Sequence, residues 1–143
     1  MDEKIVKKKK KAKGITAKAK KKTSVSRAVI RPGKGVVRIN KRNLTAFQPA
    51  QIRDFIMEPV EIAAEKAREV NITVNVHGGG FMAQAVAARS AIAKALVAFF
   101  KDEKLKKKML AYDRLLLVDD IRRKESKKQL GVGARRKKQK SKR

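Results

Sequence analysis

One stretch of the sequence, residues 71–100, reads as a strand, a glycine triplet and the longest apolar helix of the chain. Residues 72–77 alternate between β-branched apolar and polar side chains, which is the pattern of a strand with one buried face. The three glycines that follow permit backbone conformations that a Cβ would forbid. At 100° per residue, most of the large apolar side chains between Met82 and Phe100 share one broad helix face. The stretch therefore predicts a helix that covers a sheet and anchors the hydrophobic core.

Two shorter segments ahead of this stretch, residues 24–31 and 36–40, predict further strands. In the first, both faces mix apolar and polar residues, so the sequence does not determine which face points inward. In the second, the alternation turns Arg38 outward. A proline and two glycines lie between the segments and favour a tight turn. We therefore expect a hairpin with Arg31 and Lys34 at its tip.

Two helical pieces and one more strand complete the expected domain. A short helix should run from Pro49 through Met57 until Pro59 interrupts it, and a second helical piece should cover residues 61–70. Residues 115–118 form a short continuous apolar run. Such a run predicts an inner strand that is buried on both faces.

The net charge of +27 is concentrated at the two ends of the chain. Residues 1–22 carry +9 and residues 122–143 carry +11, whereas the 99 residues between them carry +7. Segments this basic bury little apolar surface and repel themselves, so in the free protein they should be disordered. The sequence predicts a flexible basic N-terminal arm at 1–22, a globular domain at 23–121 and a basic C-terminal tail at 122–143. A polyanion is the natural partner, because each neutralised phosphate releases condensed counterions.

Residue usage argues against several other functions. The absence of cysteine and the single histidine exclude disulfide frameworks, thiol catalysis and the usual zinc-site patterns. The carboxylates are scattered, without a spaced pair for acid–base catalysis or a metal. Polar residues interrupt the apolar stretches before the roughly 20 residues that span a bilayer, and no apolar region follows the basic N-terminus as in a signal peptide. We expect a cytoplasmic, non-enzymatic protein without cofactor, metal, membrane or small-molecule substrate.

Two features of the central stretch leave alternatives open. Gly78, Gly79 and Gly80 fit a tight strand-to-helix turn, and the alternative is contact between backbone amides and a nucleic-acid phosphate. His77 beside them resembles an esterase oxyanion loop only superficially, because no G-x-S-x-G elbow or second histidine exists.

Arg89 lies in the middle of the apolar helix face, where burial without a partner would cost several kcal/mol. It should therefore pair with an internal carboxylate or, as the alternative, contact RNA.

The C-terminal tail is the most specific functional feature of the sequence. Basic clusters at residues 122–128 and 134–143 are separated by a glycine-containing link. Extended at about 3.3 Å per residue, the tail could reach roughly 70 Å from the domain and thread through folded RNA. Trp is absent and Tyr112 is the only tyrosine, so the chain offers no aromatic platform for stacking bases. The residues alone predict a protein that binds structured RNA through phosphates, shape and arginine forks.

Motifs along residues 19–143 resemble those of the ribosomal small-subunit protein nine family, particularly its archaeal form. The motifs are Lys21-Lys22-Thr23-Ser24-Val25-Ser26-Arg27, Arg31-Pro32-Gly33-Lys34-Gly35-Val36-Val37-Arg38-Ile39-Asn40, Val76-His77-Gly78-Gly79-Gly80 with Gln84, Arg89 and Ala93, and Gly133-Ala134-Arg135-Arg136 followed by Gln139-Lys140-Ser141-Lys142-Arg143. Two positions depart from the archaeal pattern. Lys142 stands where a tyrosine is usual, and Ile121 stands where a proline is common.

The resemblance implies a two-layer α/β fold with a four-stranded mixed sheet, helices on one face and a left-handed β-α-β crossover. It also implies a structural place in the head of the small ribosomal subunit, beside neighbouring head proteins, with the tail running to the transfer RNA in the peptidyl site. The expected ribosomal-RNA contacts are Lys20, Lys21, Lys22, Thr23, Arg27, Arg31, Lys34, Arg38, Arg122, Arg123, Lys124, Lys127, Lys128, Arg135, Arg136 and Lys138. The expected transfer-RNA contacts are Lys140, Ser141, Lys142 and Arg143.

Two other classes of protein compete with this interpretation. A free-standing nucleic-acid compaction or chaperone protein would use the same charges without a fixed site. Co-sedimentation with small subunits at moderate salt distinguishes it from a ribosomal constituent. An enzyme is the more distant alternative, since distant relatives of such a fold catalyse phosphoryl chemistry, but catalytic residues are absent from the sequence.

Overall fold

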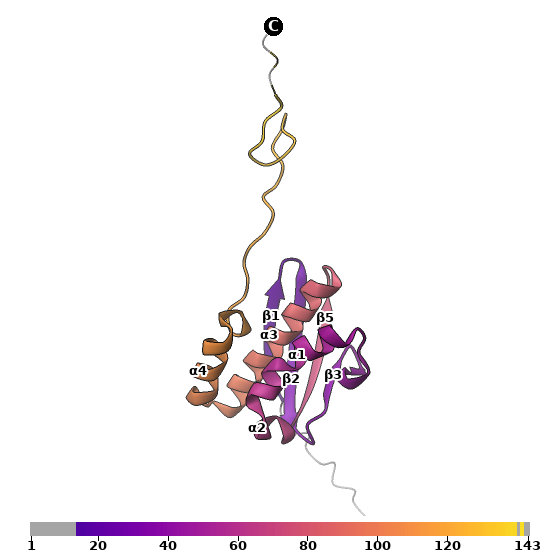
Figure 1. The fold of residues 1–143 in the computed structure, drawn as a ribbon, viewed down its shortest axis with the longest axis vertical. Coiled ribbons are helices and arrows are strands. Elements are labelled where there is room, and N and C mark those ends of the chain that lie inside the picture. Colours follow the sequence, from indigo (N-terminus) through magenta and orange to yellow (C-terminus); the bar gives the residue numbers. More distant parts are fainter. Residues whose placement is uncertain (1–13, 140, 142–143) are drawn as a thin grey trace, which may run out of the picture.

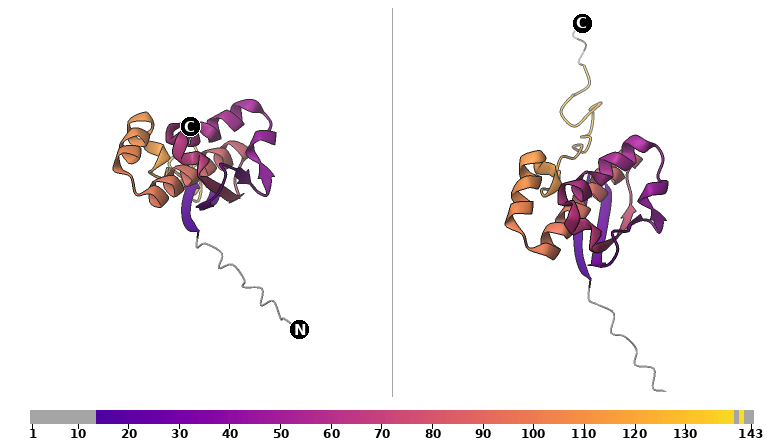
Figure 2. Two further views of the ribbon diagram at one scale, coloured as in Figure 1. Left: turned by 90° about the horizontal axis from the view of Figure 1, so that it is seen from below. Right: turned by 60° about the horizontal axis from the view of Figure 1, so that its bottom comes forward.

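The computed structural model describes residues 14–139 and 141. A sheet forms one layer, and α1 and α3 pack on one of its faces to form the other (Figure 1, Figure 2). The strands are β1 (Ile15–Lys21), β2 (Ser24–Pro32), β3 (Val37–Ile39), β4 (Arg42–Asn43) and β5 (Val70–His77). The helices are α1 (Ala50–Ala63), α2 (Glu65–Arg68), α3 (Phe81–Phe100) and α4 (Glu103–Tyr112), with 3-10 turns η1 (Leu44–Ala46) and η2 (Arg114–Leu116). The predicted two-layer α/β class is confirmed.

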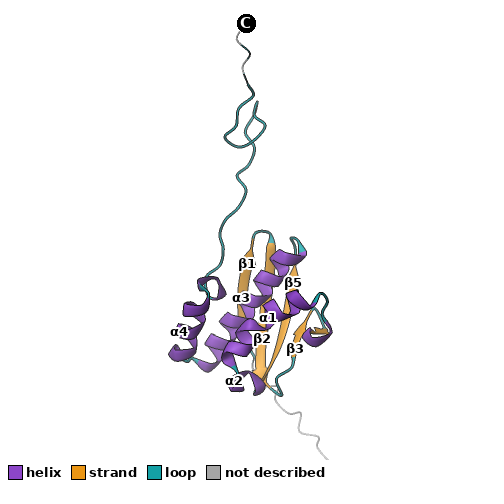
Figure 3. Ribbon diagram, viewed as in Figure 1, coloured by secondary structure: helices purple, strands orange, loops and turns teal. Residues whose placement is uncertain are grey.

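The sheet is mixed, with the strand order β1-β2-β5-β3-β4. β3 and β5 pair in parallel, and the other neighbouring strands pair antiparallel (Figure 3). In Figure 1, β3 and β5 run upward, α1 lies in front of them and β5 lies to the left of β3. The crossover from β3 through α1 to β5 is therefore left-handed, as expected. The sheet has five strands rather than the predicted four, because β1 and the two-residue β4 both join it and residues 115–118 do not.

The predicted hairpin between residues 24–31 and 36–40 is wrong. β2 pairs with β1 on one side and with β5 on the other, so β5 separates β2 from β3. The loop between β2 and β3 is tied to β5, where Asn71 Oδ1 accepts hydrogen bonds from the backbone N–H groups of Lys34 (2.9 Å) and Val36 (3.1 Å). Turn residues indicated where the chain bends, but they could not indicate which strand would fill the space beside it.

β1 lies within residues 1–22, the range predicted for the N-terminal arm. Its side chains alternate, so that Ala19 is fully buried while Lys18 and Lys20 are exposed. Each residue of β1 has a partner in β2, from Ile15 with Ile30 to Lys21 with Ser24. The sheet thus takes in part of that range, and the division of the free chain into arms and domain stays a prediction.

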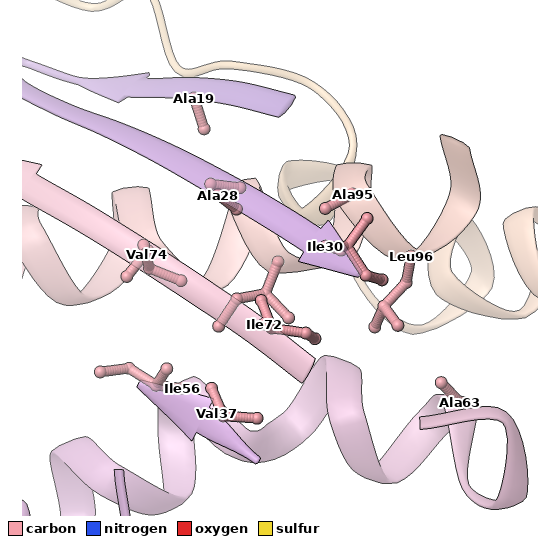
Figure 4. Packing of buried hydrophobic residues seen from close by; sticks show 14 of the residues in the cluster. Ala19, Ala28, Ile30, Val37, Ile56, Ala63, Ile72, Val74, Ala95 and Leu96 are labelled. Atoms are coloured by element: carbon pink, nitrogen blue, oxygen red, sulfur yellow. The ribbon is translucent and has the colours of Figure 1, made fainter. Parts of the chain in front are cut away.

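The core lies between the sheet and α3. β5 alternates as predicted, and its buried face packs toward the helix layer. Figure 4 shows Ile30 and Ile72 from the strands close to Leu96 on α3, and all three are buried. Within the described chain, α3 alone is long and apolar enough to cross a membrane, but 56% of its most apolar window is buried inside the domain. Met82, expected on the buried face, is half exposed, and alanines instead bring α3 close to its neighbours.

α1 continues through Pro59, so the predicted interruption there is wrong. An internal proline costs about 3 kcal/mol relative to alanine. Here Ile56, Pro59 and Ala63 form the buried stripe of α1, and most helical stability in proteins comes from such packing. The helix ends instead at Ala64, which has φ 44° and separates α1 from α2.

The segment after α3 also differs from expectation. Residues 115–118 do not form a strand; η2 occupies part of this run, and Leu116 is its buried side chain. The Asp113 carboxylate accepts from the Leu115 N–H at 2.8 Å, and Ser90 Oγ donates to the Leu115 carbonyl at 2.8 Å. These contacts fix a turn against α3. α4 was also not predicted from the sequence; Asp102 caps its start, and its carboxylate accepts from the Lys104 N–H at 2.8 Å.

Candidate nucleic-acid interface

The sheet face opposite α1 and α3 carries a dense group of basic side chains. Along β1, β2, β3 and β5, outward positions alternate with the buried ones. We call this surface the open face; its side chains are Thr16, Lys18, Lys20, Val25, Arg27, Val29, Arg31, Arg38, Asn71, Thr73, Asn75 and His77. Five of these twelve residues are lysine or arginine, and none is aspartate or glutamate. The open face is therefore a surface of one charge sign.

The strand register places like charges beside one another on the open face. Lys18 of β1 lies directly opposite Arg27 of β2, and Asn75 of β5 follows in the same row. Like charges directly opposite one another destabilise a sheet. Among the described residues, neither Lys18 nor Arg27 has a carboxylate within ion-pair distance. A bound polyanion would remove this repulsion.

A hollow of about 360 Å³ opens on the same face, where β2, β3 and β5 meet. Arg31 and Arg38 line it from β2 and β3, and Asn71 and Thr73 line it from β5 between them. A guanidinium can hold a phosphate with two parallel hydrogen bonds, and amide or hydroxyl groups can complete the contacts. The hollow thus combines two arginine forks with neutral hydrogen-bonding groups.

The structure brings only some of the predicted ribosomal-RNA residues together. Lys20, Arg27, Arg31 and Arg38 share the open face, whereas Lys34 lies in the loop between β2 and β3. Lys22 and Thr23 form the exposed turn between β1 and β2. Four further residues of the open face were not predicted from the sequence as candidates: Lys18, Asn71, Thr73 and Asn75. Alternation in residues 15–21 was the signal that could have placed Lys18 on the outward side of a strand.

The glycine triplet has a structural reason at two of its positions. Gly78 and Gly79 have φ values of 77° and 66°, in the region that side chains with a Cβ disfavour. A Cβ on Gly78 would lie 2.7 Å from the Thr23 carbonyl oxygen, because this turn packs against the turn between β1 and β2. Gly80 has open space around its Cα. These contacts favour the tight-turn interpretation, and a phosphate contact at the triplet stays a prediction.

Arg89 pairs with internal carboxylates, which was the favoured alternative. Its side chain is 7% exposed, with one guanidinium nitrogen 2.5 Å from Glu58 Oε2 and another 2.7 Å from Asp113 Oδ2. The guanidinium carbon lies 4.4 Å from the centre of the Phe55 ring, a cation–π distance. Arg89 therefore joins α3 to α1 and to the start of η2.

Two aspartates attach the start of the tail to the domain. Asp119 Oδ1 accepts from Lys94 Nζ (2.7 Å) and from the Lys20 N–H (3.2 Å). Asp120 forms an ion pair with Lys21, and residues 21 and 120 also form a parallel β-bridge. We call Asp119 and Asp120 the tail clip. Lys21 lies on the same side of β1 as Ala19, away from the open face, and its pair with the clip fixes where the tail leaves the domain.

The tail clip is built to persist at neutral pH. Hydrogen bonds from Arg122, and then from Lys21, hold the pKa of the Asp120 carboxyl well below its usual range. A carboxyl whose pKa is lower in the folded protein than in the unfolded chain stabilises the folded form at pH values above its pKa in the unfolded chain, which is near 3.9. That stabilisation is lost as the pH falls through the lowered pKa.

Replacing Asp120 with alanine should loosen the start of the tail. The backbone N–H of Arg122 donates to Asp120 Oδ1 at 2.9 Å, so its hydrogen exchange, measured by NMR at neutral pH, should accelerate in Asp120→Ala. Glu125→Gln is the control, because Glu125 pairs with Arg135 farther along the tail. Unchanged exchange at Arg122 in the Asp120 variant would show that the clip does not hold the tail in solution.

Beyond the clip, the tail projects away from the domain (Figure 1). The predicted contacts Arg123, Lys124, Lys127, Lys128, Arg136 and Lys138 are exposed, as is Ser141. Arg122 and Arg135 are exposed as well, but their guanidinium groups pair with Asp120 and Glu125. A bridge between Gly131 and Lys137 folds part of the tail into a small loop. The predicted transfer-RNA contacts Lys140, Lys142 and Arg143 lie outside the described residues.

The described part of the chain shows no cluster of three or more His, Asp or Glu side chains that could hold a metal ion. The carboxylates with close partners there are paired with lysine or arginine. The arrangement suits electrostatic binding of an extended anion.

Comparison with known proteins gives consistent matches over most of the chain. The family model described as Ribosomal protein S9/S16 matches residues 19–143. The Small ribosomal subunit protein uS9 of Picrophilus torridus is 46% identical over 122 residues, covering 85% of this chain and 92% of that protein. The protein of the same name from Thermoplasma acidophilum is 48% identical over 122 residues, covering 85% and 95%. That from Methanothrix thermoacetophila is 47% identical over 127 residues, covering 89% and 96%.

Proposed function

The chain belongs to the ribosomal protein S9/S16 family, and we propose that it is a structural constituent of the small ribosomal subunit that binds the subunit's RNA. The observation that carries the RNA-binding role is the open face, with five basic side chains and no carboxylate. Proteins bind RNA largely through phosphate contacts, which need such a surface. The names of the relatives support the placement in the small subunit.

The tail extends this interface away from the domain. Its described residues after the clip leave the domain in one direction and expose their lysines and arginines (Figure 1). We propose that the stem of the tail, residues 122–128, binds ribosomal RNA near the domain, and that residues 140–143 reach the transfer RNA in the peptidyl site. The family resemblance supports this assignment, together with a position in the head of the subunit beside other head proteins. The role is structural and cytoplasmic, without a catalytic step.

The RNA affinity of the full chain should depend steeply on salt. With two basic segments and the open face we expect at least about six phosphate contacts, and each contributes about −0.7 to −0.9 to the slope of log K against log salt concentration. Filter binding to small-subunit RNA between low and moderate salt measures this slope. A slope flatter than about −3 would show that most of the positive charge is not at the interface.

A fixed place in the subunit is tested separately from RNA affinity. If the protein is a constituent, a tagged chain in cell extract should sediment with small subunits at moderate salt, in a constant ratio to the subunit. A compaction or chaperone protein would instead spread over many RNAs and be removed by competitor RNA. Sedimentation with mixed RNA alone would contradict the proposed function.

A further inference from the structure

We propose that the open face binds the sugar–phosphate backbone of base-paired RNA and does not bind unpaired bases. The proposal rests on the proposed function, since it takes RNA as the partner, and it names the class of RNA that this surface fits. It concerns the sheet alone and is independent of what the tail contacts.

Positive charge is spread over the width of the open face. The cations Lys18, Lys20, Arg27, Arg31 and Arg38 extend over β1, β2 and β3, with β5 between the last two strands. Neighbouring strands are about 4.8 Å apart, so these side chains cover a width of roughly 15 Å. Such a broad array matches charges arranged over a surface better than a single line of phosphates. A duplex presents phosphates from two strands, whereas a single strand presents one row.

The phenylalanine and tyrosine side chains lie away from the open face. Unpaired bases are held chiefly by stacking on aromatic rings, which contributes about 1–3 kcal/mol per base. The chain has five phenylalanines and one tyrosine. They are Phe47 before α1, Phe55 on α1, Phe81, Phe99 and Phe100 on α3, and Tyr112 on α4. The open face therefore carries none of them, and His77 at the end of β5 is its only ring.

Short polar side chains lie between the cations of the open face. Thr16, Thr73, Asn71 and Asn75 supply short hydroxyl and amide groups in the same rows as the basic residues. Paired RNA is recognised mostly by its shape and by contacts to phosphates and 2′-hydroxyls across a wide, shallow minor groove. Short polar groups between long cations, spread over one face of a sheet, fit that groove. The hollow between Arg31 and Arg38 then has room for a protruding phosphate.

The test uses the full chain and three changes on the open face: Arg27→Gln, Arg31→Gln and Arg38→Gln in one variant. The matched control replaces Lys104, Lys106 and Lys107, which are exposed on α4, with glutamine. Both variants lose three positive charges. Fluorescence anisotropy measures binding to a blunt RNA duplex and to an unstructured single strand of the same length, each over a range of salt. Thermal unfolding confirms that both variants fold; the open-face variant should be at least as stable as the parent, because its like-charge pair is removed.

We expect the open-face variant to bind the duplex at least tenfold more weakly than the control variant does. For the duplex, the slope of its log K against log salt concentration should be shallower by about 2 to 3, since each lost phosphate contact reduces that slope by about one. Its affinity for the single strand should equal that of the control. If both variants lost the same affinity for the duplex, the open-face site would be overturned, while RNA binding by the chain would stand. A larger loss on the single strand would overturn the assignment to paired RNA. A parent protein that binds neither probe with a steep salt slope would contradict the proposed function itself.

Discussion

Replacing Arg89 with alanine should lower the free energy of unfolding by about 3–5 kcal/mol. Arg89 is 7% exposed and holds two carboxylates, from Glu58 at 2.5 Å and Asp113 at 2.7 Å. Removing it leaves both carboxylates without their shared cation, and they are only 24% and 28% exposed. It also removes the packing of the guanidinium on Phe55. Urea unfolding followed by circular dichroism measures the loss.

Arg53→Ala is the matched control for this substitution. Arg53 also lies beside a carboxylate, at 2.9 Å from Asp54, but that pair is exposed on α1. Its loss should change stability by no more than about 0.5 kcal/mol. If Arg89→Ala were as stable as the parent but bound RNA more weakly, the other alternative from the sequence would hold, and Arg89 would be an RNA contact.

Deleting Ser141, Lys142 and Arg143 should weaken the binding of transfer RNA in the peptidyl site by several-fold to about a hundredfold, with subunit assembly nearly intact. A hydrogen bond to a charged group contributes about 1.5–3 kcal/mol, and 1.4 kcal/mol corresponds to tenfold in affinity. An arginine fork can hold a phosphate through two bonds, which lysine cannot. Filter retention of transfer RNA on purified subunits that carry the truncated chain measures the change.

Lys127→Gln with Lys128→Gln is the control, because it removes the same number of positive charges, two, from the exposed stem of the tail. This variant should affect assembly on ribosomal RNA and leave transfer-RNA affinity close to that of the parent. Deleting residues 122–143 entirely should impair both steps. Unchanged transfer-RNA binding in the three-residue truncation would restrict the tail to anchoring on ribosomal RNA.

Periodicity predicted those elements whose pattern is local. β5 and α3 follow directly from alternation and from the apolar helix face, and Val37 and Ile39 are buried in β3 with Arg38 outward, as expected. The pairing of strands depends on contacts between distant residues, so the placement of β5 between β2 and β3 carried no local signal. Pro59 was similarly misleading, because its intrinsic cost is local whereas the packing that offsets it comes from α3.

The binding surface was predictable as a set of residue types and not as an arrangement. Arg27, Arg31 and Arg38 were identified from their charge and motifs, but their gathering on one face requires the observed register. The ion pairs of Arg122 with Asp120 and of Arg135 with Glu125 could not be predicted from the sequence. They depend on how the chain turns between each arginine and its carboxylate. Charge counts therefore overstate the number of free cations in the tail.

The position of the last buried side chain has a consequence for how the protein is made. Leu116 is the final residue of the described core, and 27 residues follow it in the sequence. At about 5–20 residues per second, their synthesis takes roughly 1–5 s. Mixed α/β domains of this size fold in about milliseconds to seconds once their residues are available. Translation order thus produces the strands and α3 before residues 122–143, so these elements can begin to pack while the most basic segment is still being made.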